Sequence, residues 1–175
     1  MKKILAFSII FTFALASCSS NPANTNENAG AKEKTPTTTA MQNHLSFKIN
    51  GIEWQADSEI FGAFHPKGYN KAILISGSKG GNDKNEQAFS IILYNTSSPG
   101  VFDITNGNKD NNVIQLANMS PANFMYGSMM GFNMKINVTA ASENPTHIEA
   151  TFEGELTGNA GDELKITEGK FQYHD

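Results

Sequence analysis

The chain contains no arginine, and all 13 of its basic residues are lysines. Charged residues make up 17% and hydrophobic residues 39% of the 175 residues, both below the usual globular share, and 20 asparagines fill much of the gap. The formal net charge is −4. Proteins that bind nucleic acids favour a basic surface and use arginine to bind phosphate and guanine, so this composition argues against a nucleic-acid partner.

Cysteine is almost absent, since Cys18 is the only one. One cysteine excludes an internal disulfide framework and a cysteine-rich metal site. A hydrophobic run long enough for a transmembrane helix, about 20 residues, is also missing. The apolar segment at residues 4–15 is interrupted by Ser8 and Thr12 and has the length of the apolar part of a signal peptide.

This segment follows two lysines and ends in Leu15-Ala16-Ser17-Cys18. The four residues resemble the lipobox of bacterial lipoproteins, in which an aliphatic residue and two small residues precede a cysteine. The resemblance implies that residues 1–17 are a lipoprotein signal peptide that is cut off before Cys18. It also implies that the thiol of Cys18 carries a diacylglycerol and that the amine exposed by the cut is acylated. The alternative is a secreted protein whose only cysteine falls at this position by chance.

A lipidated Cys18 makes the membrane a partner of the protein, because each buried methylene of an acyl chain contributes about 0.8 kcal/mol. It also uses up the only thiol, which excludes thiol catalysis. Ser19 stands where an aspartate would resemble an inner-membrane retention signal. We therefore expect a location at the bacterial outer membrane, facing the periplasm.

Residues 18–43 have the composition of a disordered, lipid-anchored tether. They contain no aromatic residue and are rich in asparagine, threonine, proline and glycine. Such a segment cannot bury enough surface to offset the loss of chain entropy on folding. As a flexible coil it spans about 25–30 Å.

The pattern changes at residue 44 to the period of two that is typical of β-strands. Apolar and polar residues alternate on both sides of Asn50-Gly51, which is the strongest short signal for a β-hairpin. A two-residue turn pairs Phe47 with Trp54 on the buried face and Lys48 with Glu53 on the exposed face. The sequence therefore predicts a type I′ hairpin at the start of the domain.

Further segments of this kind predict about nine or ten strands in residues 44–175. Residues 88–94 are apolar on both faces, which indicates a central strand. The other expected strands are residues 60–64, 71–76, 101–104, 113–117, 132–138, 148–156, 164–166 and 171–173. Helical periodicity is nearly absent, apart from one short helix that could begin at Ser120-Pro121 and end at Gly127. The fold class is therefore all-β: an antiparallel β-sandwich or a flattened barrel.

In the last segment, residues 164–173, the apolar residues switch from one face of the strand to the other. They are even-numbered as far as Ile166 and odd-numbered from Phe171. A β-bulge or tight bend at Glu168-Gly169 explains the change, and a plain turn between two short strands is the alternative.

The opening LSFKINGIEWQA and the closing FEGELTG and LKITEGKF resemble a group of small lipoproteins of the Bacteroidota. Members of that group combine a lipobox with an all-β domain of unknown function. The similarity covers about a third of the domain, and its motifs are those of hairpins. It implies a fold and a location, and it defines no catalytic residue.

Sequence motifs of common enzymes are missing: there is no G-x-S-x-G, H-E-x-x-H, G-x-x-x-x-G-K or G-x-G-x-x-G. The four histidines occur singly, and we expect His147 and His174 to lie in solvent. Glu153 and Glu155 form a carboxylate pair on one strand, which is the spacing a hydrolase could use, but an exposed acidic face is the better interpretation.

Two segments have features of metal sites. Five methionines lie within residues 119–134; Met130 and Met134 continue an apolar strand face and are expected in the core, which leaves three thioethers free to bind copper. Residues 106–112 have oxygen side chains at alternate positions, as calcium loops do, but lack their aspartates and final glutamate. Core packing and turn formation explain both, so the sequence predicts no metal and no cofactor.

Aromatic residues could form a platform on which a sugar stacks. Trp54 is expected in the core, so Tyr69, in a loop between Gly68 and Asn70, is the candidate ligand-binding residue.

Together these features predict a non-enzymatic binding or accessory module of the cell envelope. Its partner would be a glycan, a small ligand or an envelope protein. One alternative is a lipocalin-like barrel that carries an apolar ligand, and another is a hydrolase that uses the carboxylate pair.

Overall fold

The computed structural model describes residues 42–65, 71–81 and 84–175. Its regular structure in these ranges consists of eleven β-strands, so the all-β prediction is confirmed. Within the described residues, no helix is long and apolar enough to cross a membrane. The short helix expected from Ser120 is wrong: the chain closes a turn there, with the amide of Ser120 donating to the carbonyl of Asn123, and then forms a short strand.

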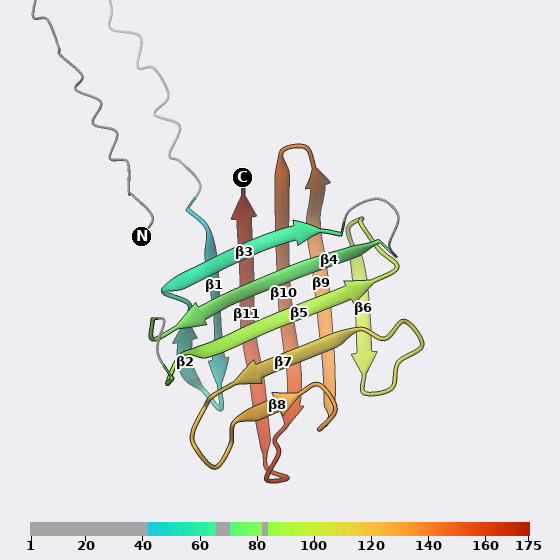
Figure 1. The fold of residues 1–175 in the computed structure, drawn as a ribbon. Coiled ribbons are helices and arrows are strands. Elements are labelled where there is room, and N and C mark those ends of the chain that lie inside the picture. Colours follow the sequence, from blue (N-terminus) through green and yellow to red (C-terminus); the bar gives the residue numbers. More distant parts are fainter. Residues whose placement is uncertain (1–41, 66–70, 82–83) are drawn as a thin grey trace, which may run out of the picture. The chain divides into compact units, whose positions relative to one another are not determined.

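The strands form two antiparallel sheets that are not closed into a barrel, so the fold is a β-sandwich. In spatial order, the six-stranded sheet comprises β2 (Ile52–Gln55), β1 (His44–Ile49), β11 (Glu163–His174), β10 (Thr146–Thr157), β9 (Phe132–Glu143) and β6 (Gly100–Thr105). The five-stranded sheet comprises β3 (Ser58–Phe64), β4 (Ala72–Lys79), β5 (Gln87–Tyr94), β7 (Val113–Ala117) and β8 (Met125–Gly127). Figure 1 shows that the strands of the two sheets cross at a steep angle, as in orthogonal sheet packing.

The two sheets enclose one hydrophobic core that is rich in aromatic rings. Phe89 of β5 packs between the sheets against Phe47 of β1, at 4.6 Å between ring centroids, and against Phe152 of β10, at 5.3 Å. Trp54 stacks on Phe47 and is 2% exposed. Its indole N–H donates to Gln87 at 2.8 Å, which satisfies the one polar atom of the ring.

The predicted hairpin is confirmed in register. Phe47 lies directly opposite Trp54 and Lys48 directly opposite Glu53 in the backbone register. Both turn residues have positive φ, 50° at Asn50 and 84° at Gly51. Ile52 has the parity of the buried face but is 75% exposed, because it adjoins the turn in the edge strand β2.

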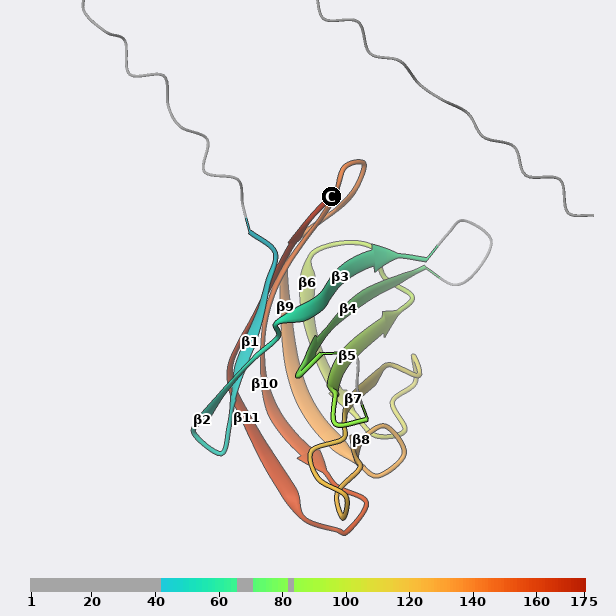
Figure 2. The ribbon, with the colours of Figure 1, turned by 60° about the vertical axis from the view of Figure 1, so that its left-hand side comes forward.

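The predicted bulge is also confirmed, and residues 163–174 form one continuous strand. In the ladder between β11 and β1, Ser46 lies opposite Lys170 and Lys48 lies opposite Thr167. The extra residue of β11 falls between these pairs, and Glu168 has a φ of 55°. A bulge increases the local bend of a strand, and Figure 2 shows β9, β10 and β11 curving around the five-stranded sheet. Because of this bend, both halves of β11 direct apolar residues into one core.

Candidate functional site

The two residues that the sequence singled out for lipid and ligand, Cys18 and Tyr69, lie outside the described residues. Lipidation of Cys18 and ligand binding at Tyr69 therefore remain predictions. The other candidates can be placed, and their surroundings differ in what they can bind.

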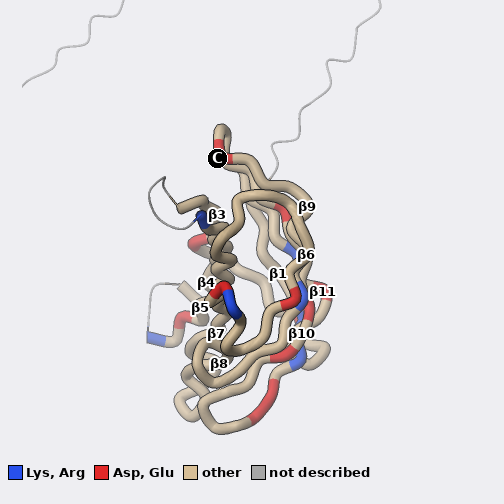
Figure 3. The backbone as a smooth tube through the Cα atoms, turned by 90° about the vertical axis from the view of Figure 1, so that its right-hand side faces the viewer, with Lys and Arg blue, Asp and Glu red and all other residues tan. Residues whose placement is uncertain are grey.

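The carboxylates of Glu153 and Glu155 lie exposed on the outer face of the six-stranded sheet. Each stands opposite a lysine on a neighbouring strand, Glu153 opposite Lys135 and Glu155 opposite Lys165. Figure 3 shows that acidic and basic positions alternate along this side of the molecule. Such a mixed, hydrated face is typical of strand surfaces.

The asparagine-rich loop at residues 106–112 uses its side chains to hold itself. Asn108 donates to the carbonyls of Thr105 and Asn112, both at 2.9 Å, and accepts from the amide of Asn112. The buried Asn112 accepts from the amide of Tyr94 at 2.7 Å. The side-chain amides of these asparagines therefore stabilise the turn, as expected from the preference of asparagine for turns.

The methionines occupy different environments. Met134 is buried in the core, as predicted, and Met119 packs against the core from outside. The prediction that Met130 is in the core is wrong, and Met129 beside it is even more exposed. The chain turns at Ser128 and Gly131, which both have positive φ, so the strand alternation starts only at Phe132.

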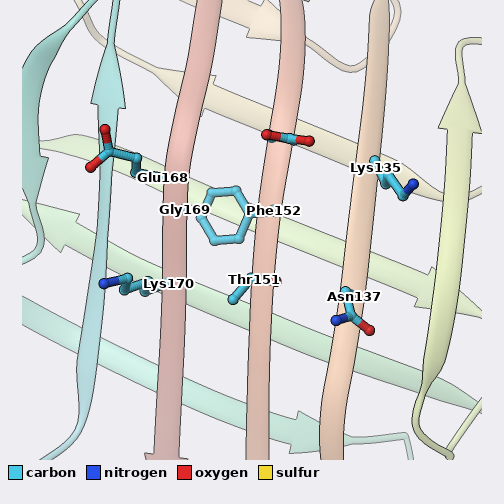
Figure 4. A pocket seen from close by; sticks show the side chains of 8 residues that line it. Lys135, Asn137, Thr151, Phe152, Glu168, Gly169 and Lys170 are labelled. Carbon is cyan, nitrogen blue, oxygen red and sulfur yellow. The ribbon is translucent and has the colours of Figure 1, made fainter.

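A hollow of about 340 Å³ lies on the outer face of the six-stranded sheet, and we call it the outer-face hollow. Its lining residues come from β9, β10 and β11: Lys135, Asn137, Thr151, Phe152, Glu153, Glu168, Gly169 and Lys170. Figure 4 shows the ring of Phe152 beside Gly169, with Lys135 and Lys170 on opposite sides. The volume falls within the range of small-molecule sites.

Gly169 and the bulge of β11 lie next to the outer-face hollow. Gly169 stands directly opposite Phe152, and a Cβ at Gly169 would overlap the ring of Phe152. On the core side of the sheet, the phenyl ring thus fills the space of the missing side chain. Glu168, in the bulge, accepts a hydrogen bond from the ammonium of Lys48 of β1 at 2.7 Å. Lys48 therefore forms its ion pair with Glu168, although Glu53 is its cross-strand neighbour.

The remaining charges of the outer-face hollow are free to meet a ligand. Among the described residues, Lys135, Lys170 and Glu153 form no ion pair, although Glu153 stands directly opposite Lys135. Two ammonium groups, a carboxylate, an amide and a hydroxyl therefore border one hollow. This set can hydrogen-bond a polar ligand in several directions.

A second group of side chains that could bind a ligand lies further along β10 and β11, and the sequence did not predict it as a group. His147 and Glu149 are two residues apart on β10, and His174 of β11 stands directly opposite His147. We call these three residues the histidine cluster. The two imidazole rings stack at 3.8 Å with an interplanar angle of 23°, and Nε2 of His147 lies 3.0 Å from Oε1 of Glu149.

The expectation that these histidines lie singly in solvent is wrong, since the structure pairs them and half-buries both. One ring nitrogen from each and a carboxylate oxygen of Glu149 lie within 4.8 Å of one another. The pattern His147-x-Glu149 on an alternating strand was visible in the sequence, but the register that brings His174 opposite was not.

No protein-family model matches the chain, and no curated protein and no solved structure matches it either. The resemblance to lipoproteins of the Bacteroidota therefore stays a prediction from the sequence. The function must be argued from the surface features themselves.

Proposed function

We propose that the protein is a lipid-anchored, non-enzymatic binding module of the bacterial outer membrane, facing the periplasm, and that it holds a polar ligand in the outer-face hollow. The observation that carries this proposal is the group of unpaired charged side chains around the hollow, on an otherwise hydrated sheet face. A few charged and polar groups that converge on a concave site are a usual feature of a ligand site.

The ligand class follows from the lining groups. Lys135 and Lys170 offer ammonium donors to carboxylate and hydroxyl oxygens, and Glu153 accepts from hydroxyl, amide or ammonium groups. A glycan fragment that carries acyl-amide, carboxylate and amine groups satisfies all of these, and the soluble fragments of cell-wall glycan have this chemistry. We therefore propose such fragments as the ligand.

The two alternative functions have less support. A lipocalin-like carrier needs an apolar lumen larger than its side chains fill, whereas the space between these sheets holds the rings of Phe47, Phe89 and Phe152 in mutual contact. A hydrolase needs two carboxyls across a cleft, whereas Glu153 and Glu155 lie exposed on one strand, opposite lysines.

Amide chemical shifts of the full chain carrying Cys18→Ala test the proposal, with soluble cell-wall glycan fragments and neutral oligosaccharides titrated separately. We expect the cell-wall fragments to shift amides around the outer-face hollow, and the double substitution Lys135→Ala/Lys170→Ala to remove these shifts. Lys165→Ala is the matched control, because Lys165 is an exposed lysine of the same strand and lies outside the hollow.

The proposal of this ligand site fails if no amide of the hollow shifts with any fragment, or if the shifts survive the double substitution. Shifts that occur equally with neutral oligosaccharides would refute the role assigned to the charges.

A further inference from the structure

We propose that the histidine cluster binds a divalent transition-metal ion, with Zn²⁺ as the expected ion. The cluster offers two imidazole nitrogens and one carboxylate oxygen. This donor set is one that zinc uses in proteins when three side chains bind the ion and a fourth position stays open.

The distances fit one ion. Zinc binds imidazole nitrogen and carboxylate oxygen at about 2.0–2.2 Å, so two donors of one tetrahedral ion stand about 3.3 Å apart. Nε2 of His147 and Oε1 of Glu149 are separated by 3.0 Å, which is close to this value. All three donor atoms lie within 4.8 Å of one another, so a modest rotation of the side chains brings them to a common ion.

An independent observation at His174 points to a missing ligand. Its Nε2 atom is buried and has no hydrogen-bond partner among the described residues. Buried polar atoms in folded proteins nearly always have a partner. A bound metal ion would supply one, since the lone pair of a neutral imidazole is both a hydrogen-bond acceptor and a metal ligand.

The backbone holds the donors in place. His147 and His174 are the outermost cross-strand pair of the ladder between β10 and β11, and Glu149 follows on the same face. The backbone amide of His174 donates to Oδ1 of Asn43 at 2.8 Å, which ties this end of β11 to the segment before β1. The three donors therefore sit on two strands whose register is set by backbone pairing.

The neighbours leave the cluster free of competing cations. The residues paired with His147 and Glu149 on the adjoining strand β9 are Ser142 and Ala140, and Gln172 stands opposite Glu149 on β11. None of these carries a charge. The ion pair of Glu149 in the described residues is with His147 itself, so metal binding would replace one internal contact and break no other ion pair.

Imidazole donors select the class of metal. Calcium and magnesium prefer shells made entirely of oxygen, whereas zinc, copper and nickel bind imidazole well. Zinc imposes no geometric preference of its own, so it tolerates three donors on a curved sheet better than an ion that requires a square-planar arrangement.

Zinc titration of the full chain carrying Cys18→Ala, purified without an affinity tag, tests this proposal directly. The substitution removes the only thiol, which would otherwise compete for zinc. We expect one equivalent of Zn²⁺ to bind and to raise the melting temperature. Loss of even an outer partner of a metal ligand costs about 10–100-fold in affinity, so His147→Ala and His174→Ala should each weaken binding by about 100-fold or more. Glu149→Gln keeps a weaker oxygen donor and should lose less.

His65→Ala is the matched control, because His65 packs edge-on against Tyr94, outside the cluster, and should leave the affinity unchanged. The melting temperature of each variant without metal shows whether it folds; where an alanine variant does not, His147→Gln or His174→Gln replaces it. The visible spectrum of bound Co²⁺ adds a second readout, since it reports imidazole ligation and should change in the histidine variants.

Two outcomes would overturn the proposal. One is a folded wild-type chain that binds no zinc at micromolar concentration, and the other is zinc binding that survives loss of both histidines. The proposal does not rest on the glycan site, because the histidine cluster shares no residue with the outer-face hollow.

Discussion

Tyr126 is the residue whose acid–base behaviour the fold changes most clearly. It is 3% exposed on β8, and its hydroxyl donates to Asp162 of the loop between β10 and β11 at 2.5 Å. Burial, then the hydrogen bond to Asp162 and the charge of that carboxylate, raise the pKa of Tyr126 to about 12. The contact ties the short strand β8 to the other sheet.

This raised pKa predicts how stability depends on alkaline pH. The folded-state pKa lies above the unfolded value of about 10, so the contribution of Tyr126 is complete below pH 10 and is lost as the pH rises toward 12. A rise of two pKa units corresponds to a loss of at most about 3 kcal/mol in the free energy of unfolding. Urea unfolding at rising pH should show this loss in the wild type and a flatter dependence in Tyr126→Phe. Equal slopes in the two proteins would contradict the assignment.

Gly169 is the residue whose missing side chain leaves room for the ring of Phe152 in the core. A Cβ at this position would overlap the ring of Phe152. We expect Gly169→Ala to lower the free energy of unfolding by about 1–3 kcal/mol, because the added methyl overpacks the core. Gly100→Ala in the edge strand β6 is the control: its Cβ would meet only the tip of the Phe102 ring, at 3.3 Å, so the loss should stay below about 1 kcal/mol. Denaturant unfolding of both variants measures the difference.

At the scale of elements, the β1–β2 hairpin separates the effect of backbone geometry from that of charge. A Cβ at Gly51 would meet nothing within 4 Å, so any cost of a side chain there comes from its φ of 84°. Lys48 lies on the exposed face and pairs with Glu168. The two residues are close in the chain but contribute to stability by different means.

We expect Gly51→Val to destabilise the protein by more than about 1 kcal/mol, because a β-branched residue is strained at positive φ. Lys48→Ala should cost well under about 1 kcal/mol, because an exposed ion pair contributes little. Denaturant melts of the two variants decide between these values. A larger loss for Lys48→Ala would mean that charge, and not turn geometry, stabilises the hairpin.

At the scale of the whole molecule, the lipobox predicts how the protein is held in the cell. Wild-type protein should incorporate a palmitate analogue and partition into the detergent phase. Cys18→Ala should remain an uncleaved or soluble precursor, because it lacks the atom that is lipidated. A wild-type protein that takes up no label and stays in the aqueous phase would refute the anchor.

The composition of residues 18–43 predicts where a protease cuts. Limited proteolysis should remove this segment and leave a stable core that begins near His44, where β1 starts. Mass spectrometry of the core gives its first residue. Amides of residues 18–43 that resist hydrogen exchange would contradict a disordered tether.

Local chemistry accounts for what the sequence by itself determined. The positive φ that Asn50-Gly51 favours, the alternation of β9 and β10, and the change of parity at Glu168-Gly169 depend on neighbours in the chain, so the hairpin, the all-β class and the bulge were predicted. Strand β8 is only three residues long, too short for a pattern, and was missed.

Pairing between distant strands decided the rest. The sandwich, as opposed to the barrel, depends on which strands meet at the sheet edges, and alternation within a strand carries no such information. The turns around Ser128 set the exposure of Met130, and the ring of Phe152 fills the space of a side chain at Gly169. The register of β10 against β11 places His174 opposite His147. Each of these depends on contacts between residues that are distant in the sequence or on the path of the folded chain, so only the tertiary structure could reveal them.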